Sequence, residues 1–216
     1  MPSEWSLVMP LKRLSLAKSR LSAAGGRRPG LALAFAQDTV TAALASSLVR
    51  EVTVVTDDPV AGERLGALGA RIVPDGPRNG LNPALAYGAD TVRARLPTAS
   101  VAALHADLPA LRPSELARVL RAARHHPRSF LADTAGTGTT VLAAGPGVPL
   151  APAFGDASRE RHRASGAAEL ELTGVESVRR DVDTEDDLRA ALVLGVGPRT
   201  AAASAEGLRR SGASRR

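Results

Sequence analysis

Short apolar runs alternate with longer amphipathic stretches along most of this chain of 216 residues. The runs are apolar at consecutive positions, which favours strands buried on both faces, and the stretches between them have helical spacing. Such strands separated by helices predict one doubly wound α/β domain, with three layers and a mostly parallel sheet. The expected strands are residues 7–11, 52–56, 71–73, 100–105, 130–132 and 139–144, with a further extended run at 175–182.

Residues that favour helix ends mark the boundaries of the amphipathic stretches. Pro59 stands in the first turn of the helix expected at 59–68, and Gly69 follows its end. Asn82 is expected to cap the next helix, with Pro83 at its first position. Two strands flanking a Gly/Thr-rich loop after residue 130 predict an antiparallel excursion. Further helices are expected at 31–48, 114–124 and 184–194.

The basic charge of the chain is concentrated at its end. The formal net charge is +6, and +4 of it falls in residues 199–216, which are rich in Ala, Ser, Gly and Arg. We therefore expect one domain over residues 1–198 and a disordered tail over 199–216. Because the body lacks a basic footprint, we expect no nucleic-acid binding by the folded domain, although the tail itself leaves that possibility open.

The composition excludes several other classes of protein. Aromatic residues make up only 2% of the chain, which disfavours a base-stacking platform for single-stranded nucleic acid. The absence of cysteine excludes disulfides and thiolate metal sites. No leader pattern and no apolar run near 18 residues are present, so we expect a cytoplasmic protein that does not bind membranes.

Two acidic stretches, at 107 and at 181–183, are candidates for a metal site. Asp107 follows a buried strand, at the edge of the sheet where ligands bind, and carboxylate oxygens suit Mg²⁺. Asp181 and Asp183 end a later extended run, and strand alternation puts them on the same face. The competing interpretation is that Asp107 caps the turn before Pro109 and that Asp183 caps the helix that follows.

Basic and small residues suggest phosphate binding. Lys12 and Lys18 are the only lysines among 28 basic residues, and both lie in the stretch that follows the first strand. A chance pairing is the alternative. Glycines and hydroxyls at 136–140, and Gly155 and Ser158 before a helix start, also suit an anion. Neither a Walker loop nor a dinucleotide fingerprint is present.

Taken in order, these motifs resemble the 2-phospho-L-lactate/phosphoenolpyruvate guanylyltransferases of coenzyme F-420 biosynthesis. Each motif is modest alone, but seven in order, spanning residue 7 to about 195, are specific. The chain departs from the family at His105, which interrupts the apolar run usual before the aspartate. The matching stretches are residues 10–12 with 17–21, 55–58, 80–82, 106–109, 136–139, 154–155 with 158–159, and 181–184.

The resemblance implies a nucleotidyltransferase fold and a reaction of GTP with a small phosphorylated carboxylate. The products are a guanosine diphosphate-linked compound, passed to a downstream transferase, and pyrophosphate. In the family, bacterial Arg-rich members are assigned phosphoenolpyruvate and archaeal members 2-phospho-L-lactate, so by resemblance this Arg-rich chain is expected to use phosphoenolpyruvate. By resemblance, Thr140, Gly155 and Ser158 bind the acceptor, while Asp107 and Asp183 hold the metal, expected to be Mg²⁺.

The remaining roles follow from charge and position. Lys18 and Arg20 are expected to offset charge on the departing pyrophosphate beside the catalytic Asp107. Lys12, Gly80 and Asn82 are expected to contact the nucleotide. The alternatives are a nucleotidyltransferase for another base or acceptor, a GTP-binding regulator without turnover, and a nucleic-acid-binding protein that acts through its tail.

Overall fold

One mixed sheet forms the centre of the computed structural model, which describes residues 5–16, 21 and 28–213. Within those residues the strand order is β3-β2-β1-β4-β6-β5-β7. The strands are β1 (Trp5–Pro10), β2 (Val49–Val55), β3 (Arg71–Val73), β4 (Ser100–Leu104), β5 (Arg128–Ala132), β6 (Thr139–Ala144) and β7 (Ala168–Glu169).

Strand directions confirm the mostly parallel sheet and the antiparallel excursion. β3, β2, β1 and β4 run parallel, whereas β6 pairs antiparallel with both β4 and β5. Because β6 is reversed, its first residues lie at the same edge of the sheet as the last residues of β4. The register shifts near Ala132, which pairs with Thr139 while Leu131 pairs with Val141, so Thr140 is the extra residue of a bulge.

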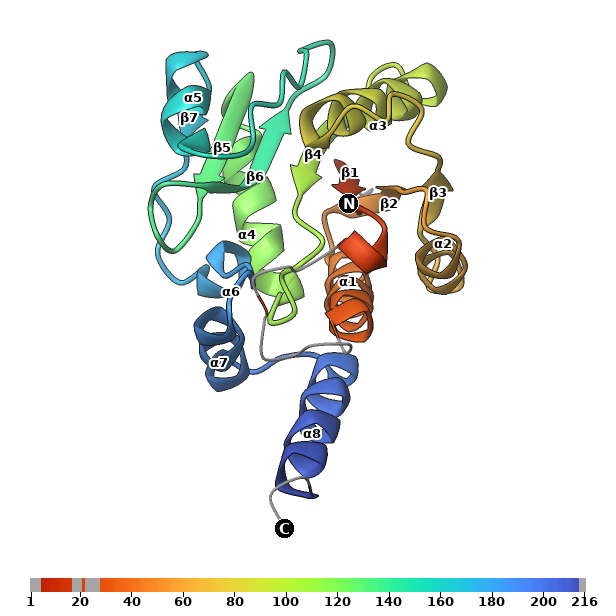
Figure 1. The fold of residues 1–216 in the computed structure, drawn as a ribbon. Helices are drawn as coiled ribbons and strands as arrows, with labels where there is room; N and C mark the ends of the chain where they lie inside the picture. The colour runs from red at the N-terminus through yellow and green to blue at the C-terminus, as the bar shows by residue number, and fades with distance from the viewer. Residues whose placement is uncertain (1–4, 17–20, 22–27, 214–216) are drawn as a thin grey trace.

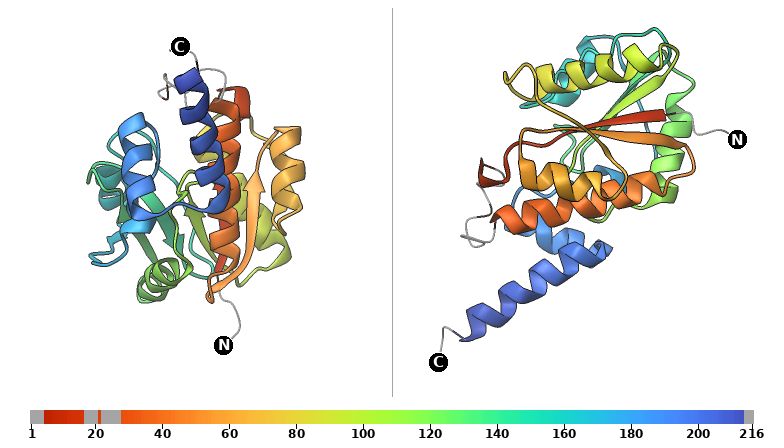
Figure 2. Two further views of the ribbon diagram at one scale, coloured as in Figure 1. Left: turned by 90° about the horizontal axis from the view of Figure 1, so that it is seen from below. Right: turned by 90° about the vertical axis from the view of Figure 1, so that its right-hand side faces the viewer.

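Helices cover both faces of the sheet, which gives the predicted three layers (Figure 1; Figure 2, right). One face packs against α1 (Arg28–Leu44), α2 (Pro59–Gly66), α4 (Pro113–Ala123) and α6 (Glu176–Arg179). The other packs against α3 (Leu81–Arg95), and α5 (Ser158–Ala164) lies on that side through His162, whose ring meets Phe130. Alternate strand residues serve the two cores, since Leu7 and Met9 face α1 while Val8 faces α3.

Helix α3 approaches the sheet closely at Gly88. A Cβ built there would lie 2.5 Å from Val8 Cγ1 and 2.8 Å from Val55 Cγ2. Only glycine permits this approach, which brings the first turn of α3 beside the ends of β1 and β2.

The prediction of an extended run at 175–182 is wrong over the first half of that range, where the helix α6 forms instead. The buried carboxylate of Glu115 accepts hydrogen bonds from the backbone N–H of Ser177 (2.9 Å) and from its hydroxyl (2.7 Å). This contact with α4 lies 62 residues away in sequence, so no local pattern reveals it. Residues 180–183 follow without regular secondary structure.

The start of α3 also differs from the prediction. Gly80, with φ of 98°, occupies the cap position, and Asn82 lies inside the helix. The Asn82 amide instead donates to the Phe154 carbonyl (3.1 Å) and accepts from the Phe154 N–H (2.7 Å). The helix α7 (Glu185–Leu194) is capped by Thr184, which forms a capping box with Asp187, and not by Asp183.

A helix, α8 (Pro198–Ala213), forms where a disordered tail was expected. The buried carboxylate of Asp38 in α1 accepts hydrogen bonds from the N–H groups of Arg199 (3.3 Å) and Thr200 (2.8 Å). The prediction from composition was therefore wrong at the start of this segment, because the distant Asp38 side chain caps it. α8 lies beside α1 and extends away from the sheet (Figures 1 and 2).

Candidate active site

A cavity of about 370 Å³ opens at the ends of β1 and β2, beside the start of α3. Its volume falls within the range of small-molecule pockets. Two predicted nucleotide-binding residues, Lys12 and Gly80, line it, whereas Asn82 does not. The apolar lining includes Leu11, Val55, Leu81 and Ala84, and the charged lining is Lys12, Arg13, Asp57, Asp75 and Arg78.

Hydrogen bonds fix the segments that form this cavity. Asp58 accepts from the Leu14 N–H (2.8 Å), which holds the turn that carries Lys12 and Arg13. Asp57 accepts from the Asp75 N–H (3.1 Å), and its other oxygen lies 3.1 Å from Nε of Arg78. The loop after β3 is therefore fastened to the end of β2.

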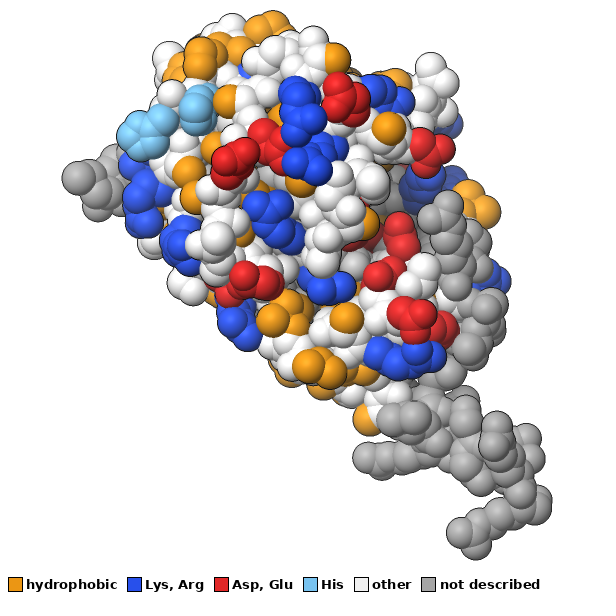
Figure 3. All heavy atoms as spheres, turned by 90° about the vertical axis from the view of Figure 1, so that its left-hand side faces the viewer, with side chains coloured by type: hydrophobic (Ala, Val, Ile, Leu, Met, Phe, Trp, Pro, Cys, Tyr) orange, Lys and Arg blue, Asp and Glu red, His pale blue; other side chains and the backbone are white. Residues whose placement is uncertain are grey.

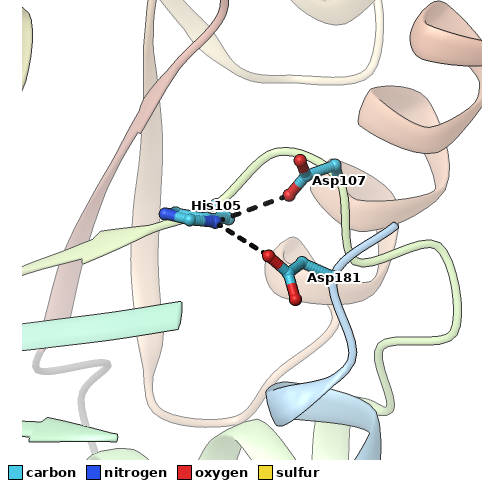
Figure 4. A group of neighbouring side chains, drawn as sticks. All are labelled: His105, Asp107 and Asp181. Atoms are coloured by element: carbon cyan, nitrogen blue, oxygen red, sulfur yellow. Dashed lines mark ion pairs between the residues drawn. The ribbon is translucent and has the colours of Figure 1, made fainter. Parts of the chain in front are cut away.

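Three side chains gather at the end of β4, next to this edge (Figure 4). Nδ1 of His105 lies 3.7 Å from a carboxylate oxygen of Asp107 and 3.8 Å from one of Asp181. One donor atom from each residue lies within 4.8 Å of the others. Figure 4 shows both carboxylates pointing to the same ring nitrogen, so the three donors surround one point.

Backbone contacts between distant segments bring the cluster together. The Val182 N–H donates to the Asp107 carbonyl (3.1 Å), which places residue 181 opposite residue 107. The Leu108 N–H donates to the Thr39 hydroxyl of α1 (3.1 Å), and this bond fixes the turn after β4. The position of each carboxylate is thus set by the fold around it.

The cluster favours a bound cation. Burial raises the pKa of the Asp181 carboxyl, and the charges of Asp107 and Asp183 act in the same direction. The nearby His105 ring acts in the opposite direction, lowering the pKa. A cation bound between half-buried carboxylates lowers the repulsion between their negative charges.

Of the two predicted metal ligands, the structure brings Asp107 into this group. Asp183 is exposed, and its backbone N–H donates to Asp187 (3.2 Å) at the start of α7. Asp181 and His105 were not among the predicted ligands. Asp181 had a sequence signal, since it shares the acidic cluster with Asp183, whereas His105 showed only as a departure from the usual apolar run.

The predicted acceptor-binding residues lie beside the cluster. The Thr140 carbonyl accepts from the His105 N–H (3.3 Å), and the buried Thr140 hydroxyl has no hydrogen-bond partner in the described part of the chain. The ring of Phe154 packs on that of His105, with centroids 5.2 Å apart, and Gly155 follows it with φ of 111°. The buried Ser158 donates its N–H to the Gly155 carbonyl (3.1 Å).

His162, another residue that sequence reasoning missed, fastens this region. Its Nε2 accepts from the Ala153 N–H (3.0 Å), so Nδ1 carries the proton and donates to the Thr139 hydroxyl (3.0 Å). Burial lowers the pKa of His162 to about 4, with help from the nearby charges of Arg128 and Arg161. This neutral ring joins α5, β6 and the loop before Gly155.

The predicted catalytic residues Lys18 and Arg20 lie outside the described residues, so their roles stay predictions. Among the residues that are described, no helix is both long and apolar enough to cross a membrane.

A donor set for a divalent cation next to a nucleotide-sized cavity, both at the carboxyl edge of an α/β sheet, is what nucleotidyl transfer requires, and this chain is a nucleotidyltransferase. Residues 35–179 match the MobA-like NTP transferase domain. Over 204 residues, covering 94% of each chain, the sequence is 69% identical to a Streptomyces avermitilis protein named phosphoenolpyruvate guanylyltransferase. The chain belongs to the phosphoenolpyruvate guanylyltransferase family.

Solved structures share the fold at low identity. A nucleotidyl transferase from Methanothermobacter superposes with a TM-score of 0.64 at 22% identity, over 88% of this chain and 97% of the other. A Mycobacterium tuberculosis protein solved in complex with manganese has a TM-score of 0.51 at 19% identity, over 89% of this chain and 100% of the other. The predicted fold class is therefore confirmed.

Proposed function

We propose that this enzyme transfers the guanylyl group of GTP to phosphoenolpyruvate, giving enolpyruvoyl-2-diphospho-5'-guanosine and pyrophosphate. The observation that carries the proposal is the grouping of His105, Asp107 and Asp181 between the cavity and Thr140, in a chain 69% identical to a relative of that name. The acceptor preference and the place in coenzyme F-420 biosynthesis rest on that resemblance.

The strand order supports one path for the substrates along the edge of the sheet. From β3 to β6 the edge carries Asp75, then Asp57, then Lys12, then Asp107, then Thr140. We assign the nucleotide to the β3–β1 side, where the cavity lies, and the acceptor to the β6 side. The α-phosphate of GTP then lies over β4, beside the donor cluster.

The donor set fits a divalent metal ion. Two ligands about 2.1 Å from one ion lie at most about 4.2 Å apart. The separations of His105 Nδ1 from Asp107 (3.7 Å) and from Asp181 (3.8 Å) satisfy that limit, and all three donor atoms lie within 4.8 Å of one another. We propose Asp107 and Asp181 as the holding carboxylates, with Asp183 as the predicted alternative to Asp181. When bound, Mg²⁺ would neutralise charge on the α-phosphate.

The chemical step requires no strong base. An oxygen of the already ionised acceptor phosphate forms a bond to the α-phosphorus, and the bond from that phosphorus to the bridging oxygen breaks. Pyrophosphate leaves with the electron pair of the broken bond. Catalysis then depends on positioning and charge, so the important residues are those that hold the acceptor phosphate in line with the α-phosphate of GTP.

The remaining predicted residues act by binding. Lys12, and by prediction Lys18 and Arg20, would offset charge on the departing pyrophosphate. Thr140, Gly155 and Ser158 would hold the acceptor, and the partnerless hydroxyl of Thr140 supports that assignment. A cysteine-free enzyme that uses GTP fits a cytoplasmic location, from which the product passes to a downstream transferase.

Pyrophosphate release tests the proposal. GTP is compared with ATP, and phosphoenolpyruvate with 2-phospho-L-lactate, in Mg²⁺ and in Mn²⁺, with a downstream coupling enzyme present to consume an unstable product. Release with GTP and phosphoenolpyruvate alone supports the full assignment, and release with phospholactate changes the acceptor. GTP binding without release for any pair would mean a non-catalytic GTP-binding regulator.

A further inference from the structure

We propose that the carboxylate of Asp75 selects guanine as the base of the nucleotide. This inference rests on the proposed function, because it takes the cavity at β1–β3 to hold GTP. Asp75 lies between the motif stretches 55–58 and 80–82 and belongs to neither.

The charges in the cavity orient the nucleotide. Lys12 and Arg13 come from the turn after β1, in the middle of the sheet edge, whereas Asp57 and Asp75 come from the ends of β2 and β3. Arg78 pairs with Asp57, so the β2–β3 side keeps a net negative charge, and a triphosphate is attracted to Lys12 and Arg13 instead. The base therefore lies at the end of the cavity with the carboxylates.

The length of the path agrees with this orientation. Strands are about 4.8 Å apart, so the end of β3 lies roughly 14 Å along the edge from the end of β4. A nucleoside triphosphate laid along the edge, with its α-phosphate beside Asp107, has its base two or three strands away. The cluster of His105, Asp107 and Asp181 is separated from the carboxylates of Asp57 and Asp75 by about this number of strands.

Asp75 is the better of the two acidic candidates because one of its carboxylate oxygens accepts no hydrogen bond from the described residues. Asp57 uses one oxygen for the Asp75 N–H and the other for Nε of Arg78. Asp75 uses Oδ1 for the Arg78 N–H (3.1 Å), and Oδ2 accepts no hydrogen bond within the described part of the chain. Asp75 is half-buried and lines the cavity.

The loop that carries Asp75 is held in a strained conformation. Arg78 has φ of 48°, a left-handed value that side chains other than glycine rarely adopt. Its backbone and side chain bind the two aspartates in turn, so Arg78 locks Asp75 against Asp57. Strain of this kind is retained where the surrounding contacts fix a position in advance.

A carboxylate at this position matches only guanine among the common bases. Guanine presents N1–H and the 2-amino group as adjacent donors, and both can point at one carboxylate. Adenine presents an N1 acceptor at the same place, which a carboxylate repels. Xanthine presents N1–H beside a carbonyl, which matches an amide side chain instead.

The test exchanges the carboxylate for an amide. In Asp75→Asn, kcat/KM should fall roughly 100-fold for GTP and rise for XTP, with the KM for phosphoenolpyruvate unchanged. Asp90→Asn makes the same charge change at an exposed position of α3 outside the cavity, and it should leave both nucleotides as in the wild type.

Nucleotide binding by calorimetry separates this inference from the proposed function. If the wild type releases no pyrophosphate but binds GTP over ATP, and Asp75→Asn moves that preference to XTP, the base assignment holds without the reaction. Wild-type discrimination of GTP from ITP, which lacks the 2-amino group, needs no variant and should be about 10-fold. An Asp75→Asn enzyme that still prefers GTP, or a wild type that binds ITP as tightly as GTP, overturns the proposal.

Discussion

Three carboxylates are candidates for the proposed metal site, and their individual positions predict different losses of activity on substitution. Asp107→Asn and Asp181→Asn each remove a charged donor from the cluster around His105, so we expect kcat to fall about 100-fold or more and Mn²⁺ affinity to fall with it. Asp183→Asn removes an exposed neighbour and should cost less. Mn²⁺ binding followed by electron paramagnetic resonance, without nucleotide, measures the affinity directly.

The melting temperature of each variant is the control, because all three should keep the fold. A larger loss for Asp183→Asn than for Asp181→Asn would restore the pair predicted from the sequence. Near wild-type turnover in Asp107→Asn would contradict the metal assignment altogether.

His162 predicts a pH dependence of stability. Its folded pKa is about 4, below the ordinary value of 6.5, so the unfolded chain binds the proton more readily. The stability that the neutral ring contributes is fully present above pH 6.5 and is lost as the pH falls towards 4. The full effect is roughly 3 kcal/mol.

Urea unfolding at several pH values measures this effect. His162→Gln keeps a donor and an acceptor without the titration, so its stability should vary less between pH 6.5 and 4 than that of the wild type. If both proteins lose stability in parallel over that range, another group is responsible.

Sequence reasoning found the residues whose chemistry is local. Asp107 follows a buried strand, and its place at the sheet edge follows from that alone. His105 and Asp181 become partners only when residues 180–183 return to β4, and His162 becomes a clamp only when α5 meets β6. Contacts between segments this far apart leave no periodic pattern in the chain.

At the scale of elements, Gly88 sets the distance between α3 and the sheet. In Gly88→Ala the new methyl group would overlap Val8 and Val55, so we expect a loss of about 1–3 kcal/mol in the free energy of unfolding. The first turn of α3 also lines the cavity, so the KM for GTP should rise. Chemical denaturation and steady-state kinetics measure the two effects.

Gly62→Ala in α2 is the matched control. Its Cβ would lie 3.5 Å from Ile72, an ordinary contact, and alanine favours the helix, so stability should be unchanged or slightly higher. Equal effects of the two substitutions would show that close packing at Gly88 is not the cause.

Element prediction succeeded where a pattern was complete within its own segment. Strands β1 to β6 follow from apolar runs, and the helix predicted at 184–194 corresponds to α7. It failed where another segment supplied the decisive contact, as Glu115 does for α6. Asn82 illustrates the same limit, because the predicted cap was wrong: Gly80 occupies the cap position, and the Asn82 amide binds the Phe154 backbone.

For the whole molecule, the C-terminal segment supplies most of the net charge and also forms α8, whose first turn binds Asp38. Truncation after Gly197 removes the N–H groups that satisfy the buried Asp38 carboxylate, and we expect it to cost about 1–3 kcal/mol. Truncation after Ala205 keeps Arg199 and Thr200 and should cost less. Thermal unfolding of the two truncated chains compares them.

The same pair of proteins tests nucleic-acid binding through the tail. The face that carries α5, α6 and α7 shows basic and acidic side chains interspersed rather than in one basic patch (Figure 3). Truncation after Ala205 removes Glu206 and four arginines, a net of +3, so any salt-dependent binding should weaken while pyrophosphate release continues. Salt-dependent binding that survives this truncation would place it on the body.

The return of residues 180–183 to β4 has a consequence for the order in which the enzyme is completed. A ribosome releases the chain from its N-terminus, so residues 10–84, which form the cavity, emerge roughly a hundred residues before Asp181. A nascent chain thus contains every described residue of the cavity while one carboxylate of the cluster is still missing. Under the assignments proposed above, the residues for nucleotide binding are synthesised well before the last of the residues for turnover.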